Sequence, residues 1–211
     1  MKTLSIETTS ETASISLLQD EKILSEFSFK DPDVAARLVN YTDMILKHSC
    51  CKPGDLDLIV VSQGPGLWTG IRLGMGFAKG LSISGARIYC VDTAGSLFFS
   101  IREFKIPSIC LVNAYRERMY LSFSNGRFSY SKIHPVKMVA YSELYKICKE
   151  GKIFLTGPGI DMLPEKIKKI KTVKIATGWM SHPRAGVNGI LAIERIKRNI
   201  PSLPLRPFYG R

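Results

Sequence analysis

A glycine-rich segment, VSQGPGLWTGIRLGMGFAKGL (residues 61–81), is the first place in this sequence where a ligand could bind. Gly64, Pro65 and Gly66 follow an apolar run typical of a buried strand, and a helix is expected to begin at residue 70 or 71. Thr69 is placed to cap that helix, and Arg72 lies in its first turn. Free backbone amides at such a helix start bind anions, so these residues predict a loop of the kind that holds a phosphate.

The two common nucleotide signatures are nevertheless missing from this loop. The P-loop signature G-x-x-x-x-G-K-[ST] is absent, because Gly66 is followed by Gly70, Ile71 and Arg72 and no Gly-Lys pair stands at the required position. The dinucleotide pattern fails as well, because Lys79 stands where the third glycine belongs. The sequence therefore does not support a P-loop nucleotidase or a Rossmann dehydrogenase.

An acidic residue, Glu7, is expected at the end of the first strand, followed by the hydroxyl of Thr8. A carboxylate in that place could hold a metal-bound nucleotide, but one carboxylate alone binds Mg²⁺ weakly. Asp92, after a later strand, is the nearest candidate for a second, and Asn113 carries no charge. The alternative is that Glu7 is only a turn residue.

Other reactive residues do not form a recognisable site. The five cysteines contain no C-x-x-C pair, and the three histidines are far apart without H-x-x-x-H spacing. No G-x-S-x-G nucleophile motif occurs. We therefore expect no bound metal, no cofactor and no catalytic residue.

Glycines recur inside the predicted helix, where Gly70 and Gly74 lie four residues apart, as do Gly76 and Gly80. Each helix-interior glycine is less favourable than alanine by up to ~1 kcal/mol, so a compensating contact is expected. Close packing inside the chain and an interface with a second chain would both supply one.

The net charge of +12 is concentrated in the last third of the chain. Residues 1–150 carry 18 basic and 15 acidic side chains, whereas residues 151–211 carry 12 and 3. The segments KIKKIKTVK (166–174) and ERIKR (194–198) could attract a phosphate backbone or an acidic protein. A solvated helix face is the simpler interpretation, and no aromatic residue interleaves with these lysines to stack on bases.

The elements that must position these residues follow from periodicity. Alternation predicts three strands, at about 2–7, 13–18 and 22–29, joined by short polar turns. Asp31 and Pro32 predict the start of a helix that ends near Lys47. A buried strand at 56–62, the glycine-rich helix, a strand at 87–91 and a helix at 94–104 complete a βββαβαβ unit, which predicts a mixed sheet with helices on its faces.

The second half predicts another mixed α/β unit. Strands are expected at 108–113 and 118–124, and Asn125-Gly126 predicts a hairpin that returns through 128–132. A helix at 142–150, a strand at 153–156, a basic helix at 161–169, a strand at 173–176 and a helix at 186–198 follow. We predict an N-terminal subdomain of residues 1–104 plus 200–211 and a C-terminal subdomain of residues 105–199.

Membrane insertion and secretion are not expected. Apolar runs are only strand-sized, well short of the ~20 residues that span a bilayer. The start, MKTLSIETTSE, reaches polar and acidic residues at once, which is not typical of a signal peptide. The expected localisation is cytoplasmic.

Five segments, spread over nearly the whole chain, stand in the same order as in a known family. They are SIETTSETASISLL, QGPGLWTGIRLGMGFAKGL, VNAYRERMYLSF, LTGPG and PLRPFYGR. Together they resemble the TsaB (YeaZ) family, and the pattern G-P-G-x-x-T-G-x-R-x-G is the most specific of them. Leu67 and Trp68 stand where the family usually has a small residue and then phenylalanine, which leaves only the local loop shape in question.

The resemblance implies an actin-like ATPase (ASKHA) architecture with two ribonuclease-H-like subdomains. It also implies a non-catalytic role beside TsaD, the protein that installs threonylcarbamoyl on the anticodon-adjacent adenosine of tRNA, with the ATPase TsaE as a further partner. The chain would meet tRNA through that complex and would form a homodimer when alone. TsaD itself has an H-x-x-x-H metal pair; that missing pair and the short length set this sequence apart, although Glu7-Thr8 is closer to the start of TsaD.

The resemblance also assigns two groups of residues. Glu7, Thr8, Gly64, Pro65, Gly66, Thr69 and Arg72 would form a vestigial nucleotide loop. The surface that pairs with TsaD, or with a second copy, would consist of Val34, Leu38, Tyr41, Ile45, Gly70, Gly74, Phe77, Ala78 and Leu81. Two enzymatic alternatives stay open at this point: an active ATPase or kinase of the actin-like superfamily, and a homologue of M22-type peptidases.

Overall fold

The computed structural model describes residues 1–114, 117–131 and 133–210, whose strands form two five-stranded mixed sheets. The first sheet contains β1 (Lys2–Glu7), β2 (Ala13–Gln19), β3 (Lys22–Phe29), β4 (Leu58–Ser62) and β5 (Arg87–Val91). The second contains β6 (Ser108–Asn113), β7 (Arg118–Ser124), β8 (Lys137–Ala140), β9 (Ile153–Thr156) and β10 (Val173–Ile175). The α-helices are α1 (Val34–His48), α2 (Trp68–Ser82), α3 (Thr93–Ser100), α4 (Tyr141–Lys149), α5 (Glu165–Lys168) and α6 (Ala185–Lys197). Tyr115 and Arg116 of VNAYRERMYLSF, the predicted strand residue Lys132 and the terminal Arg211 lie outside the described residues.

The two sheets have the same topology. The strand order is β3-β2-β1-β4-β5 in the first and β8-β7-β6-β9-β10 in the second. The central strand β1 of the first sheet is antiparallel to β2 and parallel to β4. In the same way, the central strand β6 of the second sheet is antiparallel to β7 and parallel to β9. The predicted pair of βββαβαβ units is therefore confirmed. The repetition could not be detected in the residues, because the two halves share strand order rather than side chains.

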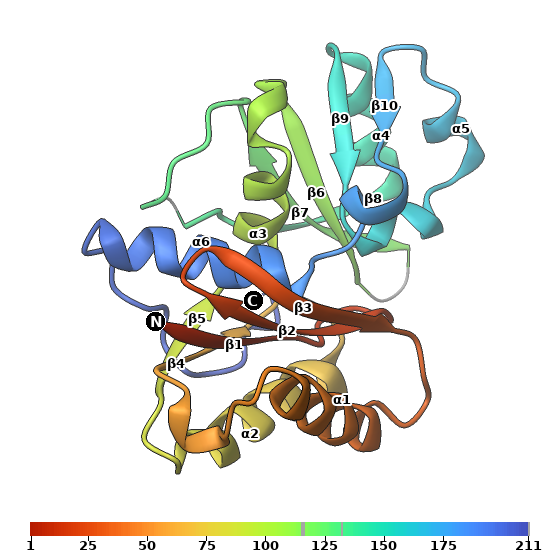
Figure 1. The fold of residues 1–211 in the computed structure, drawn as a ribbon. Helices are drawn as coiled ribbons and strands as arrows, with labels where there is room; N and C mark the ends of the chain where they lie inside the picture. Colours follow the sequence, from red (N-terminus) through yellow and green to blue (C-terminus); the bar gives the residue numbers. More distant parts are fainter. Residues whose placement is uncertain (115–116, 132, 211) are drawn as a thin grey trace.

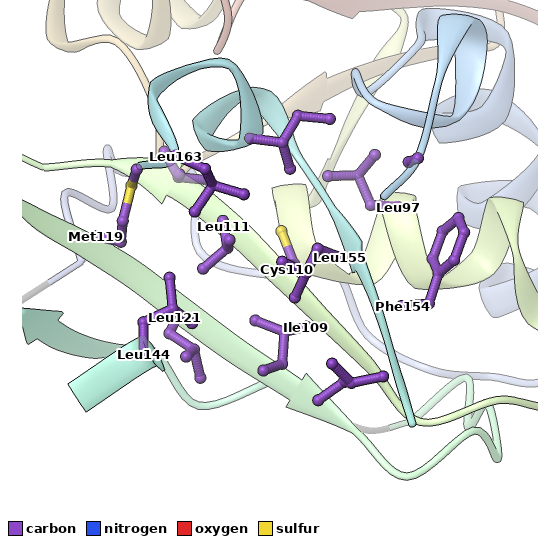
Figure 2. Packing of buried hydrophobic residues seen from close by; sticks show 14 of the residues in the cluster. Leu97, Ile109, Cys110, Leu111, Met119, Leu121, Leu144, Phe154, Leu155 and Leu163 are labelled. Atoms are coloured by element: carbon purple, nitrogen blue, oxygen red, sulfur yellow. The ribbon is translucent and has the colours of Figure 1, made fainter. Parts of the chain in front are cut away.

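Helices α3 and α6 lie side by side between the two sheets, and each packs on the sheet of the other half (Figure 1). Leu191 and Ala192 of α6 are buried with Leu18 and Val60 of the first sheet. Leu97 of α3 is buried among side chains of the second sheet, as Figure 2 shows. The division into residues 1–104 plus 200–211 and 105–199 stays a prediction, and the packing of these two helices crosses it.

The start of α6 is fixed to the first sheet by polar side chains. The hydroxyl of Ser14 accepts a hydrogen bond from the Ala185 amide at 2.9 Å. A Glu26 oxygen accepts one from the Gly186 amide at 2.9 Å, and the same carboxylate pairs with Arg184. A carboxylate at this end is also favoured by the helix dipole. These contacts hold α6 over the polar face of β1 and β2.

The predicted hairpin after Asn125-Gly126 is wrong in its second strand. The turn forms as expected, with Gly126 at a φ of 89° and the Asn125 side chain accepting from the Arg127 amide at 3.1 Å. However, β7 pairs with β8 at 137–140 rather than with residues 128–132. The rings of Phe128 and Tyr130 pack instead on Phe99, with centroids 5.4 and 6.0 Å away. Burial of these aromatic rings against α3 draws the segment away from the sheet.

The predicted start of α1 also needs correction. Asp33 is the N-cap and accepts a hydrogen bond from the Ala36 amide at 3.1 Å. Asp31, the expected cap, accepts instead from the Asp33 amide and from Arg37. The first helical residue is therefore Val34, two residues after Pro32.

Among the described residues, no helix is long and apolar enough to cross a membrane.

The segment after α6 covers the free edge of the first sheet. The Leu203 amide donates to the Cys90 carbonyl at 3.3 Å, and the Cys90 amide donates to the Ser202 hydroxyl at 2.8 Å. The Tyr89 hydroxyl donates to the Ile200 carbonyl at 2.9 Å. The edge strand β5 is thereby protected from pairing with another chain.

A buried ion pair joins α3 to α6. The Asp92 side chain accepts from the Gly95 amide at 2.7 Å, and its other oxygen lies 3.5 Å from the Arg195 guanidinium. Both side chains are almost fully buried. Burial acts to raise the pKa of Asp92, but interactions with His134 and Arg195 outweigh it, so the pKa lies below its usual value.

Replacing Asp92 with asparagine should therefore destabilise the chain by about 3 kcal/mol at neutral pH, because it leaves the Arg195 charge buried and unpaired. The pKa of Asp92 is lower in the folded chain than in the unfolded chain, where it is near 3.8. The stability that Asp92 contributes is therefore complete above pH 3.8 and is lost as the pH falls through the pKa of the folded state. Urea unfolding at several pH values measures it. Glu103→Gln, which breaks an exposed pair with Arg102, is the control and should change stability by less than ~1 kcal/mol. Equal effects of the two variants would contradict the assignment.

Candidate nucleotide loop and partner surface

The Gly-Pro-Gly loop follows β4 and is held by three parts of the chain. The Leu67 amide donates to the Thr9 carbonyl at 2.8 Å, and the Thr93 amide donates to the Gly64 carbonyl at 3.0 Å. The Phe208 amide donates to the Gln63 carbonyl at 2.9 Å. The β1–β2 turn, the start of α3 and the C-terminal tail therefore meet at this loop.

The β1–β2 turn occupies the space beside the glycines at 66, 70 and 74. The Thr8 hydroxyl donates to the Gly70 carbonyl at 2.7 Å. A Cβ at Gly66 would lie 2.6 Å from the Thr9 Cβ. A Cβ at Gly70 would overlap the Thr8 carbonyl oxygen, and one at Gly74 would overlap the Thr8 hydroxyl. Close internal packing, one of the two explanations left open above, therefore accounts for these three glycines.

Gly76 and Gly80 behave differently, although they follow the same spacing. Both are exposed, and a Cβ added to either meets no atom within 4 Å. No contact among the described residues offsets their unfavourable helix propensity. The sequence spacing could not separate these two glycines from Gly70 and Gly74, because the separation depends on which helix face the β1–β2 turn touches.

The Glu7 carboxylate is completely buried and already hydrogen-bonded on both oxygens. One oxygen accepts from the Thr9 amide at 2.6 Å and from the Thr9 hydroxyl at 2.5 Å. The other accepts from the Asn188 side chain of α6 at 2.8 Å. Burial raises the pKa of Glu7, although these hydrogen bonds act in the opposite direction. Glu7 is thus a structural link between β1 and α6.

Buried hydroxyls continue the network from Glu7 toward β4 and α3. The Thr93 hydroxyl lies 3.3 Å from the Thr9 hydroxyl and 3.3 Å from that of Ser62. Asp92, the expected second metal ligand, instead caps α3 and faces Arg195. Within residues 1–114, 117–131 and 133–210, no three His, Cys, Asp or Glu side chains are grouped to hold a metal ion. The polar groups at this edge of the first sheet are thus bonded to one another.

Thr69 and Arg72 do not have the positions expected of phosphate ligands. Helix α2 begins at Trp68 with Leu67 as an uncapped N-cap, so Thr69 lies inside the first turn. The Arg72 Nε donates to the Tyr209 hydroxyl at 2.9 Å, and its guanidinium lies 4.3 Å from the centre of the Trp68 ring. Trp68 and Tyr209 are stacked at 4.0 Å. These side chains attach the C-terminal tail to α2.

Several residues predicted for the partner surface lie inside the chain, which corrects that prediction. Leu38, Ile45, Gly74 and Ala78 are buried against the first sheet, and Gly70 lies under Thr8. Val34, Tyr41, Phe77 and Leu81 are half-buried beside the same core. The large apolar side chains of α1 that are exposed are Val39 and Met44. The apolar stripe in the sequence marks the face toward the sheet, and these two residues lie one position away from it.

Two hollows adjoin the β1–β2 turn. An open groove of about 730 Å³ lies at the starts of α1 and α2 and includes Thr8, Pro32, Val34, Leu67 and Leu73 in its lining. A cleft of about 340 Å³ lies between the halves and is lined by Thr9, Ser10, Glu11, Thr12, Lys30, Gly66, Leu67, Val112, Asn113, Pro158, Asp161, Met162 and His182. Lys30 in this cleft pairs with Glu11 at 2.5 Å.

Comparison with known proteins identifies one family. The model of the family described as TsaD, tRNA N6-adenosine threonylcarbamoyltransferase, matches residues 32–177. The tRNA threonylcarbamoyladenosine biosynthesis protein TsaB of Bacillus subtilis is 24% identical over 96% of this chain and 92% of that protein. The tRNA N6-adenosine threonylcarbamoyltransferase of Borreliella burgdorferi is 32% identical, but over 53% of this chain and 38% of that protein. The match to the transferase is therefore partial, whereas the match to TsaB extends over nearly the full length.

The solved structure of YeaZ from Pseudomonas aeruginosa has the same fold. It superposes with a TM-score of 0.75 and 18% identity, covering 99% of this chain and all of that one. A ROK family protein from Streptococcus pneumoniae superposes with a TM-score of 0.50. The expected actin-like ATPase architecture is confirmed.

The two classes of glycine should respond oppositely to alanine. Gly74→Ala should lower the free energy of unfolding by about 1–3 kcal/mol, because the new methyl group overlaps the Thr8 hydroxyl. Gly76→Ala, two residues away in the same helix, should raise it by up to ~1 kcal/mol. Urea unfolding of both variants measures the difference, and equal stability would show that the β1–β2 turn does not press on Gly74.

Removing the Glu7 charge should change the pH dependence of stability. The pKa of Glu7 is higher in the folded chain than its ordinary value of 4.5. The native chain therefore loses stability as the pH rises from 4.5 through the pKa of the folded state, whereas the Glu7→Gln variant does not. We expect the melting temperature of the glutamine variant to rise relative to that of the native chain between pH 4 and pH 8. Glu21→Gln, at an exposed position, is the control. A constant difference across this range would contradict the raised pKa.

Proposed function

Because the chain belongs to the family that the tRNA N6-adenosine threonylcarbamoyltransferase model describes, among its TsaB (YeaZ) members, we propose that it is a non-catalytic subunit that pairs with TsaD. In this role it holds and activates TsaD during threonylcarbamoylation of the anticodon-adjacent adenosine of tRNA. TsaE is the further partner of the assembly. The chain alone forms a homodimer through the surface that otherwise pairs with TsaD.

The packing of the nucleotide loop is the observation that supports a non-catalytic role. The space beside Gly66 and Gly70 is filled by Thr8 and Thr9 of the same chain. The Glu7 carboxylate, the residue best placed to hold a metal ion, is hydrogen-bonded on both oxygens and shielded from solvent. A metal-bound nucleotide would have to break these contacts before it could use the loop.

Helices α1 and α2 supply the proposed pairing surface. Both cover the same outer face of the first sheet, away from the second half of the chain (Figure 1). Their exposed residues include Val39 and Met44 on α1, and Gly76 and Gly80 on α2. Glycines at exposed positions of a helix let another backbone approach closely, and such an approach offsets their low helix propensity. We therefore assign Gly76 and Gly80, rather than Gly70 and Gly74, to the contact with TsaD.

One surface for two partners makes the homodimer and the TsaD complex mutually exclusive. An interface of the usual ~1,600 Å² would need the exposed parts of both helices. Addition of TsaD would then convert homodimer into mixed pairs, at a rate limited by dissociation of the homodimer.

Bulky residues on α2 test this proposal. Gly76→Phe and Gly80→Phe should each weaken the pair with TsaD at least 100-fold, because an aromatic ring replaces the space for the partner backbone. The melting temperature should hardly change, since both positions are exposed and a Cβ added there meets no atom within 4 Å. Size-exclusion chromatography with light scattering, on the chain alone and mixed with TsaD, is the measurement.

The matched control is Gly151→Phe, an exposed glycine in the second half that also has no atom within 4 Å of its Cβ position. It should leave both the homodimer and the mixed pair intact. Unchanged pairing of the Gly76 and Gly80 variants would place the interface elsewhere. Turnover of ATP by the chain alone would instead favour the actin-like ATPase alternative.

A further inference from the structure

We infer that the outer surface of α4, α5 and the loop before β10 binds the phosphate backbone of RNA. This lysine surface consists of Lys146, Lys149, Lys152, Lys166, Lys169 and Lys171. The choice of tRNA as the RNA rests on the proposed function, whereas the binding itself is a property of this chain alone.

The fold brings two of these lysines, Lys149 and Lys166, together beside one aromatic ring. The Lys149 ammonium lies 4.6 Å from the centre of the Tyr145 ring, and that of Lys166 lies 5.8 Å from it. Tyr145 and Lys149 are four residues apart on α4, whereas Lys166 comes from α5. No aromatic residue interleaves with the lysines of residues 166–174 in the sequence, but Tyr145, distant in sequence, is adjacent to Lys166 in space.

Contacts of Thr172 place Lys171 and Lys152 beside the end of α4. The Thr172 hydroxyl donates to the Cys148 carbonyl at 3.3 Å, and the Ile153 amide donates to the Thr172 carbonyl at 3.1 Å. Lys171 is thus next to Lys149 and Lys152. A groove of about 340 Å³, lined in part by Glu117, Arg118, Tyr141 and Lys166, opens at the same surface.

The charges of the lysine surface are exposed and not balanced within the chain. None of the six lysines forms an ion pair with a described residue, although Lys168 between them pairs with Glu165 at 3.1 Å. Some basic residues elsewhere are paired, among them Lys30, Arg184 and Lys197. On α4 the acidic residues are Glu143, in its first turn, and Glu150, which follows its last residue. Lysines crowded in this way repel one another, and a polyanion relieves that repulsion.

RNA suits this surface better than an anionic membrane does. A helix that lies on a membrane inserts apolar side chains beneath its charges. The apolar side chains Leu144, Cys148 and Ile167 are instead fully buried in the core of the second half. These buried side chains of α4 and α5 are not available for insertion into a membrane, which matches recognition of a phosphate backbone.

The lysine surface and the proposed pairing surface are at opposite ends of the molecule. Figure 1 shows α4 and α5 beside the second sheet, whereas α1 and α2 lie beyond the first sheet. Binding at one surface therefore leaves the other accessible. The chain can hold a protein partner and contact an RNA at the same time.

Charge reversal tests the inference. Lys149→Glu, Lys166→Glu and Lys171→Glu, combined in one variant, should weaken binding of a tRNA transcript at least tenfold, measured by fluorescence anisotropy with the full chain alone. The slope of log affinity against log salt should become less steep by about 3, since each lysine that binds a phosphate contributes roughly 1 to it. The matched control combines Lys22→Glu, Lys52→Glu and Arg87→Glu, which are exposed and unpaired among the described residues of the first half. It should weaken binding less than threefold.

Three results would overturn the inference. Equal weakening in both variants would show that net charge, not this surface, attracts RNA. Salt-independent binding would exclude a phosphate contact, and binding to phosphatidylglycerol vesicles with no binding to tRNA would assign the surface to a membrane. Pairing of the charge-reversed chain with TsaD, measured separately, shows whether the proposed function holds. Loss of RNA binding and loss of pairing are thereby distinguished.

Discussion

Contact between the β1–β2 turn and helix α2 is the constraint on which the first sheet and its helices depend. Thr8 and Thr9 lie so close to the helix that residues 66, 70 and 74 have no room for a side chain. The same turn anchors the Glu7 carboxylate and accepts a hydrogen bond from the Leu67 amide. Any change that moved the turn outward would disturb α2 and, through Asn188, α6 as well. A loop of the kind that elsewhere admits a phosphate is here packed against the β1–β2 turn.

The polar face of the first sheet explains why α6 has its position. Thr3, Ser5 and Glu7 alternate with Leu4 and Ile6 along β1, yet all five are completely buried. Leu4 and Ile6 face α1 and α2, so the polar residues lie beneath α6. Small residues such as Gly189 let α6 approach, because a Cβ there would lie 2.6 Å from a Leu18 methyl group. The contact of α6 with this sheet thus combines polar side chains with the apolar cluster around Leu191.

Local patterns sufficed to predict most strands and helices, the two mixed sheets and the glycine-rich loop. They failed where a distant segment decides the outcome. Phe128 and Tyr130 look like strand residues until their burial against Phe99 is known, and Gly74 and Gly76 differ only in what faces them. The roles of Glu7 and Asp92 depend on Asn188 and Arg195, about a hundred or more residues later in the chain. The grouping of Tyr145 with Lys166 depends likewise on how two helices meet.

The exchange of α3 and α6 between the two sheets has a consequence for synthesis of the chain. Glu7 is made among the first residues, but its Asn188 partner follows 181 positions later. One face of the first sheet therefore stays exposed while the ribosome completes almost the whole polypeptide. Contacts between such distant residues slow folding, because a long loop must close before they form. Each half is packed against a helix from the other, and a nascent chain stopped before α6 would present an uncovered sheet to chaperones and proteases.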